Sequence, residues 1–308
     1  MIATFAQMVE RAQKCRPARI AVAAAADREV LLAMAQAQKA GFAEPTLVGD
    51  AMAIRRLAAE LSVDLSRMRL LDEPEPRRAA VHVIGLAAQG EVDVVVKGQL
   101  KTDELLGVAL RREGGIREGG LLTHVGIFEI SRLNRLLYIS DTGVVLYPDI
   151  YQKLEIIQNA VDVAHCFGIA QPRVALLSAT EDVHPSLHGS MDALVLSRMA
   201  QQGWVDGAIV DGPLSLDVAI SPHAAAVKGV TGDVAGQADV LIVPNVEAGN
   251  MMAKSILYFG AGRMAGLVVG ARAPILINSR ADSAETRFLS LAMAVILSHV
   301  RRPQPEDE

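Results

Sequence analysis

The sequence predicts an α/β fold with mostly parallel sheets, and three observations support that prediction. Short apolar runs rich in Val, Ile and Leu alternate with longer segments whose apolar residues recur every three or four positions. Most of these runs are continuous, as expected of strands that are buried on both faces. The chain has 308 residues and is 51% hydrophobic, which is enough for two domains or one large α/β unit with a sizeable core.

Ten apolar runs are predicted as strands. They are residues 19–25, 45–49, 92–98, 122–130, 135–141, 173–179, 207–212, 238–244, 265–271 and 274–279. Helix-length segments separate most of them; two clear examples are residues 27–41 and 148–168, each ending in glycine. This alternation predicts parallel pairing. The exception is 121–141, where a short polar connection between two runs predicts an antiparallel hairpin.

Composition argues against several classes of protein. The formal net charge is −5 and no basic stripe is visible, so we expect no nucleic-acid partner. No apolar run approaches the ~18–20 residues of a membrane helix, so we expect no membrane partner. Cys15 and Cys166 form no spaced motif, which indicates reduced thiols in a cytoplasmic protein. We expect no metal site, because no Cys/His spacing suggests one. The glycine-rich segment 260–266 follows a helix and precedes a strand, the reverse of the order in a dinucleotide fingerprint.

Polar residues follow several predicted strands, and open α/β sheets bind ligands at the carboxyl ends of their strands. The candidates for substrate binding are Lys97, Thr102, Asp103, His124, Asp211, Glu247, Gly249, Asn250 and Lys254, and a further group at the last strand end is Ser279, Arg280, Asp282 and Glu285. Asn250 is predicted to cap a helix whose first N–H groups attract anions. Asp282 and Glu285 have capping-box spacing, so Ser279 and Arg280 should lie just before a helix, where phosphate can bind.

Most of these candidates also have a purely structural interpretation. Asn250 and Asp282 can be helix caps and nothing more, because caps favour these residue types. Lys97 can be a solvated residue at a strand end, and His124 a packed residue of its strand. Lys254 lies on the same side of its predicted helix as Asn250, which fits an internal helix residue as well as a ligand.

Six segments, in this order, resemble the phosphate acetyl/butyryl-transferase family. They are "KGQLKTDELL", "LLTHVGIFEI", "PDIYQKLEIIQNAVDVAHCFGI", "VDGPLSLDVAIS", "KGVTGDVAGQADVLIVPNVEAGNMMAKSILYF" and "APILINSRADSAE". The resemblance runs from about Arg19 to Leu297. It is closer to the butyryl branch, notably in "EIIQNAVDVAH" and "SRADSAE".

The resemblance implies a fold, a reaction and a set of catalytic residues. The fold is two three-layer α/β domains flanking a cleft, related to isocitrate and isopropylmalate dehydrogenases, usually in a homodimer. The reaction is reversible transfer of an acetyl or butyryl group between CoA and phosphate, with CoA as a substrate and no permanently bound cofactor. The family's Ser-Arg pair matches Ser279 and Arg280. Its proposed thiol base falls at Thr286, so the neighbouring acids Glu285 and Asp282 are the candidates for that role.

The domain prediction follows from the need for both halves of the chain to supply one ligand site. The first domain is expected to comprise residues 1–143 and 276–308, and the second residues 144–275.

Two other functions remain open. One is a metal-dependent, NAD-linked decarboxylating dehydrogenase on a related fold, for which Asp211 and Asp217 are the available acids. The other is a non-catalytic protein that binds CoA or acyl phosphate.

Overall fold

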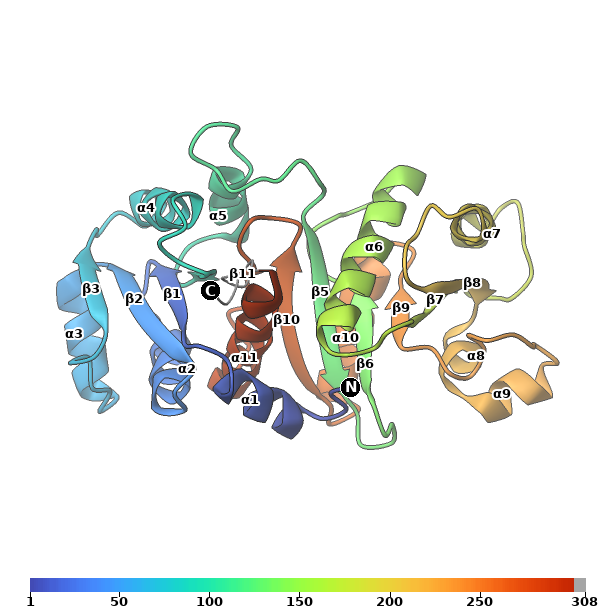
Figure 1. Ribbon diagram of the computed structural model, residues 1–308, viewed down its shortest axis with the longest axis horizontal. Coiled ribbons are helices and arrows are strands. Elements are labelled where there is room, and N and C mark those ends of the chain that lie inside the picture. The colour runs from blue at the N-terminus through green and yellow to red at the C-terminus, as the bar shows by residue number, and fades with distance from the viewer. Residues whose placement is uncertain (302–308) are drawn as a thin grey trace, which may run out of the picture. The chain divides into compact units, whose positions relative to one another are not determined.

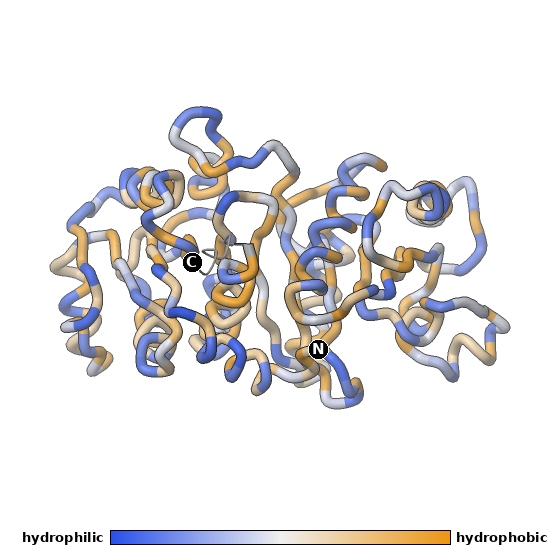
Figure 2. The backbone as a smooth tube through the Cα atoms, in the orientation of Figure 1, coloured by the Kyte–Doolittle hydropathy of each residue, from blue (hydrophilic) through white to orange (hydrophobic). Residues whose placement is uncertain are grey.

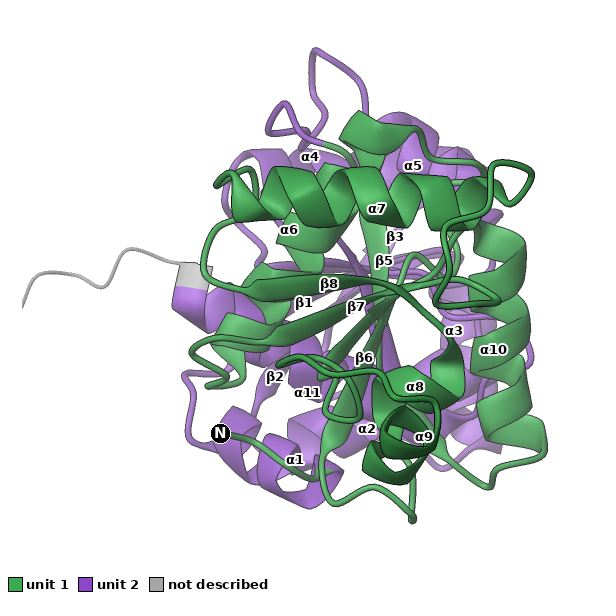
Figure 3. Ribbon diagram, turned by 90° about the vertical axis from the view of Figure 1, so that its right-hand side faces the viewer, with its two compact units in different colours: residues 1–4, 121–264 green, residues 5–120, 265–308 purple. Residues whose placement is uncertain are grey.

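The computed structural model describes residues 1–301, and the chain divides into two compact units (Figure 3). Unit 1 comprises Met1–Thr4 and Leu121–Met264; unit 2 comprises Phe5–Gly120 and Ala265–Glu308. The first boundary lies before the hairpin at 121–141, not after it as expected, because that hairpin pairs with a strand of unit 1. The second boundary lies before residue 275, because the strand that begins at Arg263 pairs with the next strand in unit 2.

Unit 2 contains a sheet in the order β3-β2-β1-β4-β11-β10. The strands are β1 (Ala18–Ala23), β2 (Ala43–Gly49), β3 (Arg69–Asp72), β4 (Val94–Lys97), β10 (Arg263–Val269) and β11 (Ile275–Leu276). All neighbouring pairs are parallel except β10 with β11. The connections reverse direction between β1 and β4, and such a switch point is where open α/β sheets bind ligands.

Helices cover both faces of the unit 2 sheet (Figure 1). They are α1 (Phe5–Gln13), α2 (Arg28–Lys39), α3 (Ala51–Glu60), α4 (Pro76–Ala88), α5 (Thr102–Ala109) and α11 (Ala284–Arg301). Helices α1, α2 and α11 pack together on one face, and α4 packs with α5 on the other. The C-terminal helix therefore returns to the N-terminal unit and packs against β11, β4 and β1.

Unit 1 contains a sheet in the order β5-β6-β9-β7-β8. The strands are β5 (Thr123–Glu129), β6 (Leu136–Ser140), β7 (Arg173–Leu177), β8 (Ile209–Leu214) and β9 (Val240–Ile242). Only the β5–β6 pair is antiparallel, which confirms the predicted hairpin. Here the strand order reverses between β6 and β9, so their carboxyl ends form the switch point of this unit.

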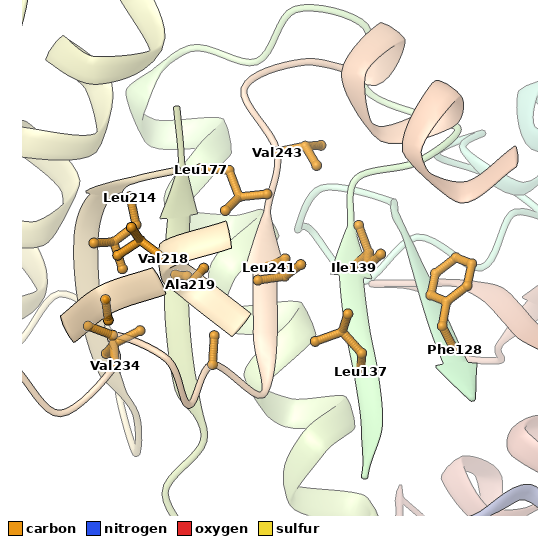
Figure 4. Close-up of a cluster of buried hydrophobic side chains, with 14 of the residues drawn as sticks. Phe128, Leu137, Ile139, Leu177, Leu214, Val218, Ala219, Val234, Leu241 and Val243 are labelled. Carbon is orange, nitrogen blue, oxygen red and sulfur yellow. The ribbon is translucent and has the colours of Figure 1, made fainter. Parts of the chain in front are cut away.

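The helices of unit 1 are α6 (Ile150–Cys166), α7 (His188–Gln201), α8 (Leu216–Ile220), α9 (Pro222–Val227) and α10 (Val246–Tyr258). Helices α6 and α7 pack on one face of the sheet, and α8 and α10 contact strands on the other. A cluster of buried aliphatic side chains fills the space between β6, β9 and α8 (Figure 4). Its members include Leu137, Ile139, Leu241 and Val218, each at most 2% exposed.

The α/β prediction is confirmed, and all ten predicted strands are present. Figure 2 shows hydrophobic residues along these strands, whereas the loop that follows α5 is mostly hydrophilic. Gly41 lies two residues after the end of α2 and Gly168 two residues after the end of α6, both with positive φ, as glycine readily allows. β3 was not predicted, because its four residues hold only two apolar positions, neither of them buried, which is too short a run to give a strand pattern.

Candidate functional site

A hollow opens at the carboxyl ends of β1, β4 and β11 in unit 2. These three strands are parallel, so the segments that follow them meet at one edge of the sheet. The hollow has a volume of about 470 Å³ and is lined by Asp27, Gly98, Gln99 and Arg280. Each lining residue lies just after one of these strands, as the strand-end argument predicts.

Gly98 allows the loops after β1 and β4 to pack closely. A β-carbon at this position would lie 2.1 Å from the carbonyl oxygen of Ala24. Backbone N–H groups of Gly98 and Gln99 instead donate to the carbonyls of Ala23 and Ala24, each at 2.8 Å. The floor of the hollow is therefore fixed by backbone hydrogen bonds.

The turn at 279–282 presents Ser279 and Arg280, which are both exposed. Asp282 stabilises it, because its carboxylate accepts a hydrogen bond from the Ser279 N–H at 2.9 Å. The predicted capping box of Asp282 and Glu285 is wrong. Helix α11 begins at Ala284, whose N–H donates to the Glu29 carboxylate at 2.8 Å, and Glu285 lies exposed in its first turn.

Two buried cations lie behind this turn. Lys97 is the last residue of β4 and is 5% exposed; its Nζ reaches the carbonyls of Gly98 and Leu100 at 3.5 and 3.3 Å. Burial, and then the charge of Arg287, hold the pKa of Lys97 below its usual range. Arg287 is 4% exposed and donates from Nη2 to the carbonyl of Ser279 at 3.1 Å. The alternative interpretation of Lys97 as a solvated residue at a strand end is therefore wrong.

Thr102 and Asp103 occupy the first two positions of α5. The carboxylate of Glu104 accepts a hydrogen bond from the Lys101 N–H at 3.1 Å, and both acids of this first turn are exposed. Two carboxylates at a helix N-terminus already interact with its positive end. This end of α5 is therefore less suited to an anion than the turn at 279–282.

In unit 1 the carboxyl end of β6 carries a hydrogen-bonded acid. The Asp141 carboxylate accepts hydrogen bonds from the N–H groups of His124, Gly143 and Val144 at 2.7 to 2.9 Å. His124 is buried on β5, and its Nδ1 lies 2.6 Å from Oγ1 of Thr142. The two strands of the hairpin thus bring a histidine, a hydroxyl and an acid to one edge.

The prediction that Asn250 caps α10 is wrong. The cap is Asn245, whose side chain accepts a hydrogen bond from the Ala248 N–H at 3.0 Å. Asn250 lies one turn inside the helix and donates to the Thr142 carbonyl at 3.4 Å. Gly249 is buried and packs on the backbone of Asp141, so it serves close helix–strand packing here.

The other two candidates on α10 differ in their surroundings. Glu247 is exposed in the first turn and accepts a hydrogen bond from the Tyr147 hydroxyl, which raises the pKa of Tyr147. Lys254 lies two turns further along α10 and is half-buried.

Asp211 lies within β8, not after it, because the strand continues through Pro213 to Leu214. Its carboxylate accepts a hydrogen bond from the Gly212 N–H at 2.8 Å. A separate ion-pair network follows β8: Lys228 contacts Glu181 and Asp217 at 3.3 and 3.1 Å. The hydrogen bond from Ser215, and then that from Lys228, lower the pKa of Asp217 to about 2.

Within 1–301, no group of three or more His, Cys, Asp or Glu side chains is arranged to hold a metal ion. Among the helices of that same part of the chain, none has the length and apolar character needed to cross a bilayer.

The structure therefore groups the predicted residues at two switch points. Lys97, Ser279, Arg280 and Asp282 meet in unit 2, and His124, Gly249 and Asn250 meet in unit 1. Sequence analysis missed Arg287. Its position in the sequence could have indicated that it is buried. Arg287 precedes Ser290 and Leu291 by three and four residues, so it shares their face of the helix, and both are buried.

The fold is α/β, and its strand ends in unit 2 bring Lys97, Arg280 and Arg287 together. The family model described as phosphate acetyl/butaryl transferase matches residues 4–85 and 75–295, so the chain belongs to that family. The phosphate butyryltransferase of Clostridium acetobutylicum is 39% identical over 298 residues, covering 97% of this chain and 99% of the relative. The phosphate acetyltransferase of Rhizobium meliloti is 37% identical over 298 residues, covering 97% and 94%.

A solved structure has the same architecture. The branched-chain phosphotransacylase from Enterococcus faecalis V583 superposes with a TM-score of 0.82 at 28% sequence identity. The match covers 92% of this chain and 99% of that chain. The α/β fold with mostly parallel strands that the family resemblance implies is therefore confirmed.

Proposed function

We propose that this protein is a phosphate acyltransferase that moves a short acyl group reversibly between CoA and inorganic phosphate. The observation that carries the proposal is the cation-rich turn of unit 2, where Arg280 borders the hollow and Lys97 and Arg287 lie behind it. Both phosphate and acyl phosphate are anions, and fixed cations stabilise them without reorganisation during the reaction. The family to which the chain belongs supports the same chemistry.

In the direction of acyl-CoA synthesis, the CoA thiolate attacks the carbonyl carbon of the acyl phosphate. A sulfur–carbon bond forms, the carbon–oxygen bond to phosphate breaks, and phosphate leaves with the electron pair. Arg280 would bind the phosphoryl group through its planar fork, and Ser279 would hydrogen-bond the thiol. Asp282 accepts a hydrogen bond from the Ser279 N–H, and Glu285 lies exposed in the first turn of α11; both carboxylates are candidates for the thiol base.

The substrate preference is proposed as acetyl or butyryl, because relatives carrying either name are similar to this chain over almost its full length. We expect no bound cofactor and a cytoplasmic location. The test is thiol release from acetyl-CoA and butyryl-CoA, with and without phosphate. Phosphate-dependent release identifies an acyltransferase, whereas binding of CoA without release identifies a non-catalytic binding protein.

We also propose a homodimer. Three large apolar side chains are exposed on and just after α10: Met251 at 64%, Tyr258 at 70% and Phe259 at 90%. Clustered exposed apolar residues favour contact with another protein surface, and two-fold pairs are the commonest assembly. Light scattering should give twice the chain mass of 32.8 kDa. A particle of a single chain mass at micromolar concentration would contradict the proposal.

A further inference from the structure

Arg287 is a buried cation whose hydrogen-bonding capacity is only partly used. It lies on the apolar face of α11 and is 4% exposed. One guanidinium nitrogen donates to the Ser279 carbonyl, but the buried Nε has no hydrogen-bond partner within residues 1–301. A buried guanidinium has five N–H donors to satisfy, and leaving such donors unmatched is costly.

Lys97 is a second buried cation with weak partners. Its Nζ contacts are long hydrogen bonds to two backbone carbonyls, at 3.3 and 3.5 Å. Neither Lys97 nor Arg287 forms an ion pair with a carboxylate in the described part of the chain. Buried charges are normally paired, so this arrangement lacks the usual compensation.

The two cations are neighbours at the same edge of the sheet. Lys97 ends β4, and Arg287 holds the segment that follows β11, the strand paired in parallel with β4. Burial is the main cause of the lowered pKa of Lys97, and the charges of Arg287 and Arg280 act in the same direction. Asp27 and Asp282 oppose this effect, but neither acid forms an ion pair with Lys97 or Arg287 in the described part of the chain.

We propose that Lys97 and Arg287 form a buried pair of like charges that is balanced by a doubly charged tetrahedral anion bound in the hollow beside Arg280. This inference rests on the proposed function, which supplies phosphate and the phosphoryl group of an acyl phosphate as such anions. Arg287 acts as a positioning residue, because it also holds the carbonyl of Ser279. The pair therefore favours dianions over monoanions of similar size.

The test measures anion binding without any acyl substrate, using isothermal titration calorimetry at constant ionic strength. The probes are inorganic phosphate and sulfate, with nitrate as the monoanion. Wild-type protein should bind phosphate and sulfate more tightly than nitrate. Arg287→Met should weaken phosphate binding about 10-fold or more, which corresponds to the loss of one charge interaction. Arg287→Lys keeps the charge and should recover most of the affinity.

Arg272→Met is the matched control. Arg272 is an exposed arginine of unit 2 that donates to the Ala88 carbonyl, away from the hollow. Its removal should leave phosphate affinity unchanged. If Arg287→Met fails to fold, Lys97→Met provides the same comparison, because it removes the other charge of the pair.

The outcomes separate this inference from the proposed function. If Arg287→Met or Lys97→Met binds phosphate as tightly as wild type does, the inference is wrong, whatever the transferase activity. The same holds if Arg287→Lys is as impaired as Arg287→Met, because the residue then serves only the shape of the turn. If the charge variants lose dianion affinity but wild type releases no thiol, the anion site stands and the proposed function fails.

Discussion

Replacing Gly249 by alanine tests the helix–strand packing at the switch point of unit 1. A β-carbon there would lie 2.4 Å from the carbonyl oxygen of Asp141 and 2.9 Å from Cγ2 of Val243. The first contact is with backbone, which cannot rotate away, so α10 must shift. Overpacking of this kind costs about 1–3 kcal/mol. Alanine is about 1 kcal/mol more favourable than glycine inside a helix. The free energy of unfolding should therefore fall by between about 0 and 2 kcal/mol.

Gly85→Ala in α4 is the matched control for this prediction. No heavy atom lies within 4 Å of a β-carbon built at Gly85, so only the helix preference acts. That variant should gain about 0.5–1 kcal/mol. Urea unfolding followed by circular dichroism measures both variants. The packing argument is refuted if Gly249→Ala gains as much stability as Gly85→Ala. Under the proposed function, Gly249→Ala should also lower kcat, because it moves the segment that holds Thr142.

Three further predictions concern single charged groups. Arg280→Lys keeps the charge but loses the planar fork, so it should lower turnover by about 10²–10³ and raise the KM for phosphate, measured by steady-state kinetics. Asp141→Asn should cost about 1–3 kcal/mol in urea unfolding, because an amide cannot accept all the backbone N–H bonds of the carboxylate. The carboxyl of Asp217 should titrate near pH 2 by NMR. Its stabilising effect should be complete above its ordinary pKa and lost as the pH falls toward 2, and Lys228→Met should raise that pKa.

Much of the unit 2 site could be predicted from the strand pattern. Continuous apolar runs indicate buried parallel strands, and parallel strands place their carboxyl ends at one edge. Lys97 lies at the end of one such run and Arg280 follows another, and the structure brings both to the same switch point. The strand ends that carry Lys97 and Arg280 could therefore be predicted without the order of the strands.

The same pattern could not choose between competing helix caps. Asn245 and Asn250 both follow the apolar run 238–244, which contains β9. Both are residue types that favour helix caps, so the sequence alone allows the helix to begin after either one. Packing decided the matter, because Gly249 must lie inside the helix to approach the Asp141 backbone. Arg287 was missed for a related reason: helical periodicity marks apolar faces, and a cation on such a face has no expected role until its neighbours are known.

The two switch points carry different charge, and the difference bears on the proposed reaction. The unit 2 switch point brings Lys97, Arg280 and Arg287 together, whereas the acid at the unit 1 switch point, Asp141, accepts hydrogen bonds from backbone N–H groups, and the neighbouring His124 contacts a hydroxyl. A phosphoryl dianion needs fixed positive charge, but a thioester carbonyl is neutral and needs only a hydrogen-bond donor. His124→Phe should therefore raise the KM for acyl-CoA or lower kcat while leaving the KM for phosphate within about twofold, since phosphate binding depends on charge in unit 2. Kinetics with each substrate varied in turn test this assignment. A large change in the phosphate KM alone would show that His124 serves the anion instead.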